Sequence, residues 1–459
     1  MAGFSPDEAA AWSGGRWVGE PPAYIGGIET DTRRDVKDRL FVALRGASLD
    51  GHAFAAPALA AGAAAVMVDE PFHASTRITG ACLVVPDTAS GLSRMASGYR
   101  DTWAAPVVAI TGSTGKTSVK EMTADLLDAA GGPVARTRGN WNNHIGLPLS
   151  MLAADRSMRV GVFELGMNHP GELRPLCDIL RPGIGVVTNV SAAHAEFFPS
   201  VDAIAEEKAT VLRAIPPDGI CIVPAEDPRV PILCKGVRGR ITTVGTGEAN
   251  DYSAVRREGR RFLVRERSSG DCVELETAMP GAHVVHNAML AIAVARHLGV
   301  GWAGIEQALR ACRPGRMRWE VIGHAGRTIV NDAYNANPAS MAAALQTLAE
   351  MPAQGRRWAV LGGMRELGER SERDHRDIGR QAASAGLAGL LGVGPYGAMI
   401  LDGAHAAGFT GELRAAEDPR EAALMLEAHT AVGDLILLKG SRSERLEDVL
   451  AAWRQISGG

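Results

Sequence analysis

Short runs of hydrophobic residues alternate with Ala-rich or amphipathic stretches along most of the chain. The runs have the length of single strands, and the stretches between them have the spacing of helices that bury one face. Strands are predicted at 39–44, 64–68, 82–86, 107–110, 161–165, 185–190 and 220–227, and a helix at 53–63. Alternation of this kind is typical of parallel sheets covered by helices on both faces.

The alternation is interrupted twice in the second half of the chain. Residues 241–277 are polar and strand-like, which predicts an antiparallel insertion, and the segment 310–320 carries the Pro and Gly residues of a linker. Further hydrophobic runs follow the linker at 328–330, 357–363, 387–394 and 434–440. We expect an α/β protein of three domains, which suits a length of 459 residues at roughly 150 residues for each domain. The expected domains are a small α/β N-terminal domain (1–103), a central parallel sheet with helices on both faces (104–314) and a C-terminal Rossmann-like domain (315–459).

Composition and charge exclude several classes of protein. Lys and Arg number 48 against 52 Asp and Glu, a formal charge of −4 without a basic tail, so we expect no nucleic-acid partner. The six cysteines are scattered without a C-x-x-C pair, which argues against a zinc ribbon and fits a reducing compartment. The N-terminus lacks the pattern of a signal peptide, and no apolar run approaches the ~18 residues of a membrane span. We therefore expect a cytoplasmic protein without membrane insertion.

The most informative local motif is the segment 107–127, where a hydrophobic strand leads into a Gly-rich turn and then into an amphipathic helix. Glycines allow successive backbone N–H groups to point at one anion, and the helix N-terminus adds positive potential. Lys116 would neutralise the β- and γ-phosphates of a nucleotide, and Thr117 would place its hydroxyl on Mg²⁺. The full Walker pattern requires Gly at position 110, where this chain has Ile110, so the loop is short. The predicted phosphate-binding residues are Gly112, Ser113, Thr114, Gly115, Lys116, Thr117 and Ser118.

This motif makes the central domain a P-loop-type domain. The alternative is a Gly-rich turn between strand and helix that carries an exposed lysine.

Segments over nearly the whole chain resemble the Mur ligase family. The loop T-G-S-T-G-K-T at 111–117 is similar to the family's short phosphate loop. Further segments similar to the family are 137–150, 163–173, 188–208 and 281–287. The resemblance implies two Mg²⁺ sites, with Thr117, Glu164, His194 and a carbamylated Lys208 as ligands. It also implies that Asn287 and Asp332 contact the nucleotide and that Arg316 reaches the γ-phosphate.

Two segments, 331–341 and 361–368, resemble the members of the family that add a dipeptide. A third, 30–54, resembles a segment that contacts the UDP-sugar end in the members that add a diamino acid or a dipeptide. The resemblance implies that the substrates are contacted by Thr32, Arg33, Asn142, Asn143, Asn335 and Asn337. The chain departs from the family pattern at Val284, where an Asn is usual, and at Gly363, where an acidic residue is usual. Thr32 replaces a serine, and Thr210 stands where a Glu is expected.

The reaction implied by the resemblance is an ATP-dependent ligation. A carboxylate of a UDP-muramoyl tripeptide attacks the γ-phosphate, and the amine of D-alanyl-D-alanine then displaces phosphate from the acyl phosphate. Lys116, Lys208, His194 and Arg316 would be the catalytic residues, the partners would be small molecules, and the protein would be a monomer. A member that adds a single diamino acid is the alternative within the family. A P-loop kinase or motor ATPase, and a non-catalytic relative, are alternatives outside it.

Without the resemblance, the same residues have simpler interpretations. Glu164 would be a solvated acid at a strand end, His194 a loop histidine, and Lys208 part of a charged helix face. Arg316 and Asp332 would be linker charges. The segment 392–397 matches G-x-G-x-x-G, but Pro395 falls inside the turn and a lone match is weak evidence for a dinucleotide site. His283 and His286 lack the further ligands of a zinc site.

Overall fold

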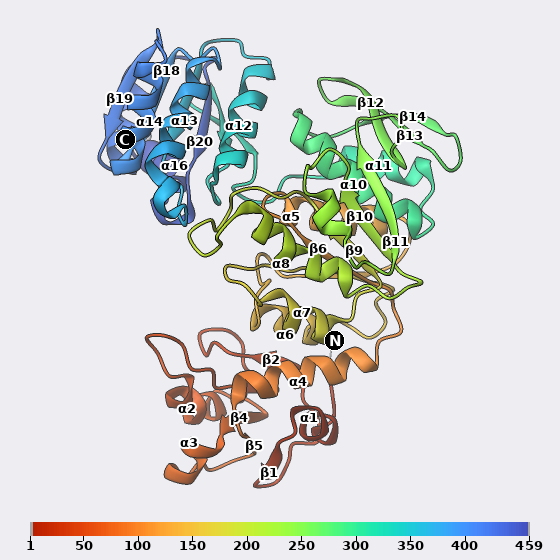
Figure 1. Cartoon of the computed structure of the whole chain (residues 1–459). Helices are drawn as coiled ribbons and strands as arrows, with labels where there is room; N and C mark the ends of the chain where they lie inside the picture. The colour runs from red at the N-terminus through yellow and green to blue at the C-terminus, as the bar shows by residue number, and fades with distance from the viewer. Residues whose placement is uncertain (1–2, 458–459) are drawn as a thin grey trace.

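Three α/β units follow one another along the chain, each built around its own sheet, in a computed structural model that describes residues 3–457. The sheets have five, nine and six strands in sequence order. Figure 1 shows the N-terminal unit at the bottom, the central unit above it and the C-terminal unit at the upper left. None of the helices between residues 3 and 457 combines the length and hydrophobicity that a membrane crossing needs.

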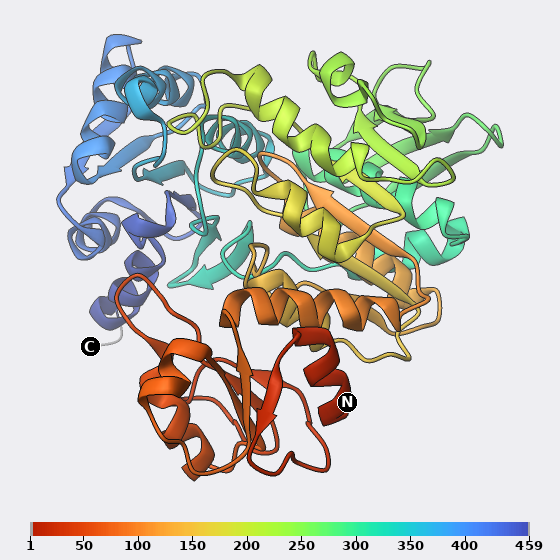
Figure 2. The same cartoon turned by 60° about the horizontal axis from the view of Figure 1, so that its bottom comes forward.

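The N-terminal unit has the strand order β1-β5-β4-β3-β2, in which only β1 runs antiparallel to its neighbour. Its strands are β1 (Arg16–Val18), β2 (Ile28–Glu29), β3 (Leu40–Val42), β4 (Ala65–Asp69) and β5 (Cys82–Val85). Its helices are α1 (Pro6–Ser13), η1 (Gly51–Phe54), α2 (Ala55–Ala60), α3 (Glu70–Ser75) and α4 (Thr88–Asp101). Helix α4 lies across the junction with the central unit, where its buried residues share one hydrophobic cluster with that unit (Figure 2).

The central unit has the strand order β14-β13-β12-β11-β10-β9-β6-β8-β7. Its strands are β6 (Val107–Thr111), β7 (Val134–Arg136), β8 (Val160–Glu164), β9 (Ile184–Val187), β10 (Ile220–Pro224), β11 (Arg240–Gly245), β12 (Tyr252–Glu258), β13 (Arg261–Glu266) and β14 (Cys272–Glu276). Its helices are α5 (Lys116–Ala129), α6 (Gly146–Leu152), α7 (Leu173–Leu180), α8 (Val201–Arg213), α9 (Val230–Cys234), α10 (Ala282–His297) and α11 (Trp302–Ala311).

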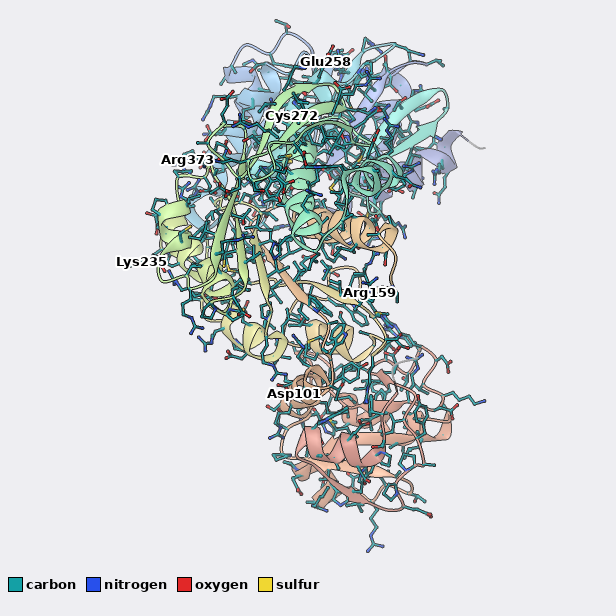
Figure 3. All side chains as sticks on the ribbon, turned by 90° about the vertical axis from the view of Figure 1, so that its right-hand side faces the viewer. Asp101, Arg159, Lys235, Glu258, Cys272 and Arg373 are labelled. Carbon is teal, nitrogen blue, oxygen red and sulfur yellow. The ribbon has the colours of Figure 1, made fainter. Side chains whose placement is uncertain are left out.

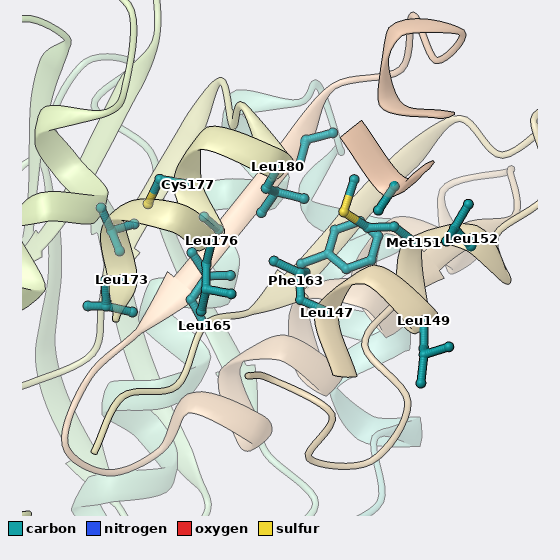
Figure 4. Close-up of a cluster of buried hydrophobic side chains, with 14 of the residues drawn as sticks. Leu147, Leu149, Met151, Leu152, Phe163, Leu165, Leu173, Leu176, Cys177 and Leu180 are labelled. Carbon is teal, nitrogen blue, oxygen red and sulfur yellow. The ribbon is translucent and has the colours of Figure 1, made fainter. Parts of the chain in front are cut away.

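Helices cover both faces of this sheet, as the sequence predicts. Along β6, Val107 and Ala109 belong to the cluster that contains α6, α7 and α8, whereas Val108 and Ile110 belong to the cluster that contains α5, α10 and α11. The alternation follows from the two-residue repeat of a strand. Figure 4 shows part of the first cluster, including Phe163 of β8 among leucines of α6 and α7.

The predicted antiparallel insertion is partly wrong. Strand β11 pairs parallel with β10, so residues 240–245 belong to the parallel sheet. The antiparallel part begins at β12, and β12, β13 and β14 extend the edge of the same sheet. Figure 3 shows Glu258 and Cys272 on this extension, where Cys272 is exposed.

The C-terminal unit has the strand order β15-β16-β20-β17-β18-β19, in which only β15 is antiparallel. Its strands are β15 (Glu320–His324), β16 (Arg327–Asn331), β17 (Arg357–Leu361), β18 (Gly389–Val393), β19 (Glu412–Ala416) and β20 (Leu435–Lys439). Its helices are α12 (Pro338–Glu350), η2 (Gly368–Arg370), α13 (Ser371–Ala383), α14 (Gly394–Ala406), α15 (Pro419–His429), η3 (Arg442–Glu444) and α16 (Glu447–Ser457).

The strand order of the C-terminal sheet reverses beside β20, and this places a crevice at the carboxyl ends of its central strands. Helices α12, α13 and α14 pack on one face and α15 and α16 on the other, because the buried residues of each set form separate clusters. The connections after β16 and β17 therefore leave toward one face and the connection after β20 toward the other. Ligands of open α/β sheets bind at such reversal points.

Candidate active site

The phosphate loop lies at the carboxyl end of β6, between the ends of β8 and β9, which both pair parallel with β6. Two of its glycines have positive φ and no room for a side chain. At Gly112 (φ 151°) an added Cβ would stand 1.8 Å from the Thr188 hydroxyl oxygen, and at Gly115 (φ 78°) 2.6 Å from the Asn287 side-chain oxygen. Helix α5 begins at Lys116, directly after this turn. Its first N–H groups are therefore free to bind an anion.

Hydrogen bonds from the next loop hold the phosphate loop in place. The Ser113 hydroxyl donates to the Ser191 carbonyl over 3.0 Å, and the Ser191 N–H donates back to that hydroxyl over 2.9 Å. The Thr114 N–H donates to the side-chain oxygen of Asn189, whose amide donates to the Thr114 hydroxyl. The side chains and the backbone groups of Ser113 and Thr114 thus fix the loop to the segment 188–191.

The Glu164 carboxylate joins the start of α5 to the Asn-rich loop, residues 137–145 between β7 and α6. It accepts a hydrogen bond from the Thr117 hydroxyl and another from the Asn142 amide, each over 2.7 Å. Glu164 is only 2% exposed. The structure therefore excludes the interpretation of this residue as a solvated acid at a strand end.

Lys208 is buried in α8, with 1% of its surface exposed, and hydrogen-bonds to none of residues 3–457. Burial, and then the charge of Lys116, hold the pKa of the Lys208 ammonium well below its ordinary value, against a smaller opposing effect of Glu207. The helix pattern alone suggested a solvated side chain. The structure instead shows a buried amine beside the phosphate loop, with a strong tendency to be neutral.

The Lys116 ammonium donates to the Gly112 carbonyl over 2.8 Å. Burial lowers its pKa, the Glu164 carboxylate raises it, and the Arg318 guanidinium lowers it further. Lys116, Lys208, Glu164 and Arg318 therefore form one electrostatic group at the carboxyl edge of the central sheet.

Arg318 and Arg316 lie two residues apart in the linker but in different surroundings. The Arg318 guanidinium carbon stands 3.9 Å from the centre of the Tyr334 ring, and its charge helps to lower the pKa of Lys116. Arg316 is exposed and Arg318 is half-buried, and both line a cleft of about 420 Å³ between α5 and the linker. Ser118 and Val284 also line this cleft, and Val284 is 3% exposed.

Asp332 is fixed at the junction of the central and C-terminal units. Its carboxylate accepts from the Lys439 ammonium over 2.5 Å and from the Trp319 N–H over 3.1 Å. Lys439 is 2% exposed and also donates to the Asn335 carbonyl. The loop after β16 is thus tied to the end of β20, at the crevice of the C-terminal sheet.

His194 lies in the loop after β9, with φ near 60°, and meets the C-terminal unit. Its Nδ1 contacts the Glu366 carboxylate. Ser191, three residues earlier, is bonded to the phosphate loop, so this loop connects the anion site to the C-terminal unit.

Comparison with known proteins identifies the family of the chain. A family model described as the Mur ligase middle domain matches residues 110–295, and one described as the Mur ligase, glutamate ligase domain matches residues 317–442. A Bacillus subtilis protein named UDP-N-acetylmuramoyl-tripeptide--D-alanyl-D-alanine ligase is 33% identical over 433 residues, which cover 93% of this chain and 92% of that protein. The chain belongs to the Mur ligase family.

Solved structures of Mur ligases share the whole fold. A crystal structure of MurF from Acinetobacter baumannii superposes with a TM-score of 0.88 at 30% identity and covers 99% of both chains. The MurF ligase of Thermotoga maritima, solved in complex with ADP, gives a TM-score of 0.81 at 27% identity over 94% of this chain and 97% of that one. The three-unit α/β architecture expected from the sequence is confirmed.

The donor groups of this Mur ligase fit Mg²⁺ bound together with a nucleotide. Within residues 3–457, no three His, Cys, Asp or Glu side chains come together in a group that holds a metal. Mg²⁺, however, is usually held by one or two carboxylates together with substrate phosphates. Glu164 and the Thr117 hydroxyl supply adjacent hard oxygens, and a neutral Lys208 amine can become an oxygen donor by carbamylation.

The predicted substrate-binding residues differ in how free their side chains are. Asn142 is engaged with Glu164, and the Asn143 side-chain oxygen accepts from the N–H groups of Ile145 and Gly146 at the start of α6. Asn337 caps α12 in a reciprocal pair of hydrogen bonds with Ser340. These contacts give Asn143 and Asn337 structural roles that the sequence pattern did not predict.

The remaining predicted substrate residues lie at the surface. Asn335 is exposed, and the Arg33 guanidinium pairs with the Asp31 carboxylate over 2.7 Å. Thr32, which lies between Asp31 and Arg33 in the sequence, is half-buried. The binding roles of all six residues remain predictions.

Lys120 is a further residue of the site region that the motifs did not reveal. It is fully buried, and its ammonium donates to the Thr137 carbonyl over 2.9 Å and pairs with the Glu121 carboxylate over 2.5 Å. It thereby anchors the start of the Asn-rich loop that brings Asn142 to Glu164. From sequence alone, a lysine in the first turns of a helix is interpreted as a solvated charge. Its role as an anchor of this loop becomes visible only in the tertiary structure.

Arg318, rather than Arg316, is expected to be the linker arginine on which turnover depends. Arg318→Ala should lower kcat/KM at least about tenfold more than Arg316→Ala, because a charge-assisted hydrogen bond contributes roughly 1.5–3 kcal/mol. Steady-state kinetics of both variants at varied ATP would test this. A larger loss in Arg316→Ala would restore the assignment made from the sequence.

Proposed function

We propose that this Mur ligase joins D-alanyl-D-alanine to the terminal carboxylate of a UDP-N-acetylmuramoyl tripeptide, with conversion of ATP to ADP and phosphate. The similarity over 93% of the chain to a ligase of that name carries the proposal. The presence of Lys116, Glu164 and Lys208 at one edge of the central sheet supports catalysis rather than a binding role. A non-catalytic relative would have no need to keep this group.

The chemistry explains why a phosphate site must adjoin the acceptor. A carboxylate is a poor acyl donor because its leaving group would be oxide, and phosphorylation provides a better one. Since an anion must attack a polyanion, catalysis depends on positioning and charge neutralisation. The N–H groups of the phosphate loop and the Lys116 and Arg318 cations would supply both at the γ-phosphate.

Glu164, Thr117, His194 and the carbamate of Lys208 would hold two Mg²⁺ ions, as in the prediction from the sequence. The metal supplies positive charge to the phosphate oxygens when it is bound. An ammonium has no lone pair to offer a metal, so Lys208 must react with CO₂ as the neutral amine before it can act as a ligand. Its burial next to Lys116 favours that neutral form.

The acceptor would enter the crevice of the C-terminal sheet. Asp332 and Asn335 follow β16, and Gly363 follows β17, all at the carboxyl edge beside β20. Arg318 of the linker and Tyr334, which follows β16, connect this edge to the phosphate loop. The domain division at 103/104 and 314/315 and a cytoplasmic location, where ATP is supplied, form part of the same proposal.

Gly363 alters the acceptor side of the crevice. A Cβ at this position would stand 2.7 Å from the Tyr396 ring and 3.1 Å from the Glu444 carboxylate, so an acidic residue does not fit without rearrangement. Glu444 already places a carboxylate there, paired with Arg365 over 2.9 Å. Glu444, rather than residue 363, therefore contributes the carboxylate at this position.

Phosphate release from ATP in the presence of the UDP-tripeptide tests the choice of acceptor. D-Alanyl-D-alanine should be preferred over D-alanine, L-lysine and meso-diaminopimelate by on the order of a hundredfold in kcat/KM. A single amino acid leaves polar groups that pair with the dipeptide unsatisfied, at roughly 1–3 kcal/mol for each group. Equal or better turnover with a single amino acid would refute the dipeptide assignment and favour a ligase for a diamino acid.

A further inference from the structure

The loop that carries His194 makes a two-point contact with the loop that follows β17 in the C-terminal unit. The Glu366 carboxylate contacts Nδ1 of His194, and the Glu196 N–H donates to the Glu366 carbonyl over 3.1 Å. Gly368 lies against the same loop, where an added Cβ would stand 3.3 Å from the Glu196 Cα. Side chain and backbone therefore both join these segments, which are 172 residues apart between His194 and Glu366.

Both ends of this contact have an unusual backbone. His194 and Glu366 have φ values of 60° and 61°, in the left-handed region that non-glycine residues rarely adopt. Such conformations persist where the surrounding structure requires them, and they concentrate at functional sites. Here each one turns a side chain toward the other across the junction between two units.

The contact uses one ring nitrogen of His194 and leaves the other free. Nδ1 faces Glu366, while Nε2 makes no hydrogen bond with any of residues 3–457. In metal sites, a ligating histidine almost always donates its second ring N–H to a carboxylate or carbonyl, which fixes its tautomer and orientation. The His194–Glu366 pair has this arrangement, with Nε2 as the atom available to a metal.

We propose that Glu366 is a positioning residue for the metal site at His194. It accepts the Nδ1 proton, directs Nε2 toward the metal, and does so only when the C-terminal unit is docked. The second metal site is then completed by the same docked arrangement that places Arg318 near the phosphate loop. This inference rests on the metal dependence in the proposed function, and it is independent of which acceptor is used.

A second ion pair across the same junction provides a matched control. The Arg257 guanidinium of β12 pairs with the Glu350 carboxylate of α12 over 2.7 Å. Like His194–Glu366 it joins the central and C-terminal units, but it involves no proposed metal ligand. Substitution of a residue that only holds the units together should affect metal binding as substitution of Glu350 does. Substitution of a positioning residue should weaken metal binding specifically.

The test is Mn²⁺ binding, followed by electron paramagnetic resonance, to the full-length protein with a non-hydrolysable ATP analogue and the UDP-tripeptide. Mn²⁺ accepts the same oxygen and nitrogen ligands as Mg²⁺ and is visible in this measurement. Glu366→Gln and Glu366→Ala should bind one of two Mn²⁺ ions roughly 10–100-fold more weakly, the usual effect of losing such a partner. Glu350→Gln should bind both ions as the unsubstituted protein does.

The Mn²⁺ ion that binds more weakly to the Glu366 variants should be the same ion that His194→Ala fails to bind. Equal Mn²⁺ affinities in the unsubstituted protein and both Glu366 variants would overturn the proposal, as would an equal loss in Glu350→Gln. Because no acceptor is present in this assay, its result does not depend on the acceptor experiment. A failed dipeptide assignment and a failed role for Glu366 are therefore separate outcomes.

Discussion

Lys116→Ala is expected to lower the rate of ATP-dependent ligation by at least roughly 10²–10³-fold, the effect of removing one preorganised charge from a transition state. The ammonium lies at the start of α5, directly after the phosphate loop, and within the electrostatic range of Glu164. Without this cation, the negative charges of the Glu164 carboxylate and of the nucleotide phosphates would lie close together uncompensated. Phosphate release at saturating ATP, UDP-tripeptide and acceptor measures the loss.

The fold should survive this substitution, because Lys116 is only half-buried and its ammonium makes one hydrogen bond, to the Gly112 carbonyl. Lys116→Met keeps the methylene stem and is the matched control for packing. Both variants should unfold at nearly the temperature of the unsubstituted protein, measured by circular dichroism. Near-normal turnover in either variant would refute the phosphate-loop assignment.

The sequence predicts the layered fold well because burial on both faces produces continuous hydrophobic runs. Strands such as β6 and β20 are buried along their whole length, so their sequence pattern does not depend on neighbouring units. The strands that sequence reasoning missed are edge strands, for example β2, which has two residues, and β19, which is partly exposed. The pairing of β11 was also mispredicted: it is parallel to both β10 and β12, and the polar pattern of a strand does not indicate its direction.

The site was predictable where its chemistry is local in sequence. The phosphate loop is a continuous motif, and the structure places Gly112 and Gly115 in the backbone conformations that the motif requires. The burial of Lys208 was not predictable from its helix, because the neighbouring cation, Lys116, comes from the start of a different helix, α5. The different exposure of Arg316 and Arg318 was equally inaccessible, since an irregular linker has no periodicity that assigns side chains to a face.

Contacts between units were the least predictable. The pair of His194 and Glu366 joins loops 172 residues apart, and neither loop has a pattern that indicates the other. The resemblance to the family supplied His194 but gave no role to Glu366. Such positions become visible only when the units are seen docked.

Lys208→Ala is expected to lower turnover by roughly 10²–10³-fold, again the effect of losing one preorganised charged group. The side chain is buried, and the low pKa of its amine allows reaction with CO₂ at neutral pH to give an anionic oxygen ligand. Alanine removes both the ligand and the volume of the side chain. A short carboxylic acid has the size and charge of the missing group, so acetate or propionate should restore part of the activity.

Rescue by a carboxylic acid distinguishes a metal-ligand role of Lys208 from a purely structural role. A lysine that served only to fill its buried position would leave a variant that no small anion reactivates, and chloride at equal ionic strength controls for unspecific salt effects. Lys208→Met keeps the apolar volume without an amine, so it should be as inactive as the alanine variant and less open to rescue, since the cavity is filled. Substantial activity in Lys208→Met, or reactivation of Lys208→Ala by chloride as strong as by acetate, would exclude the carbamate.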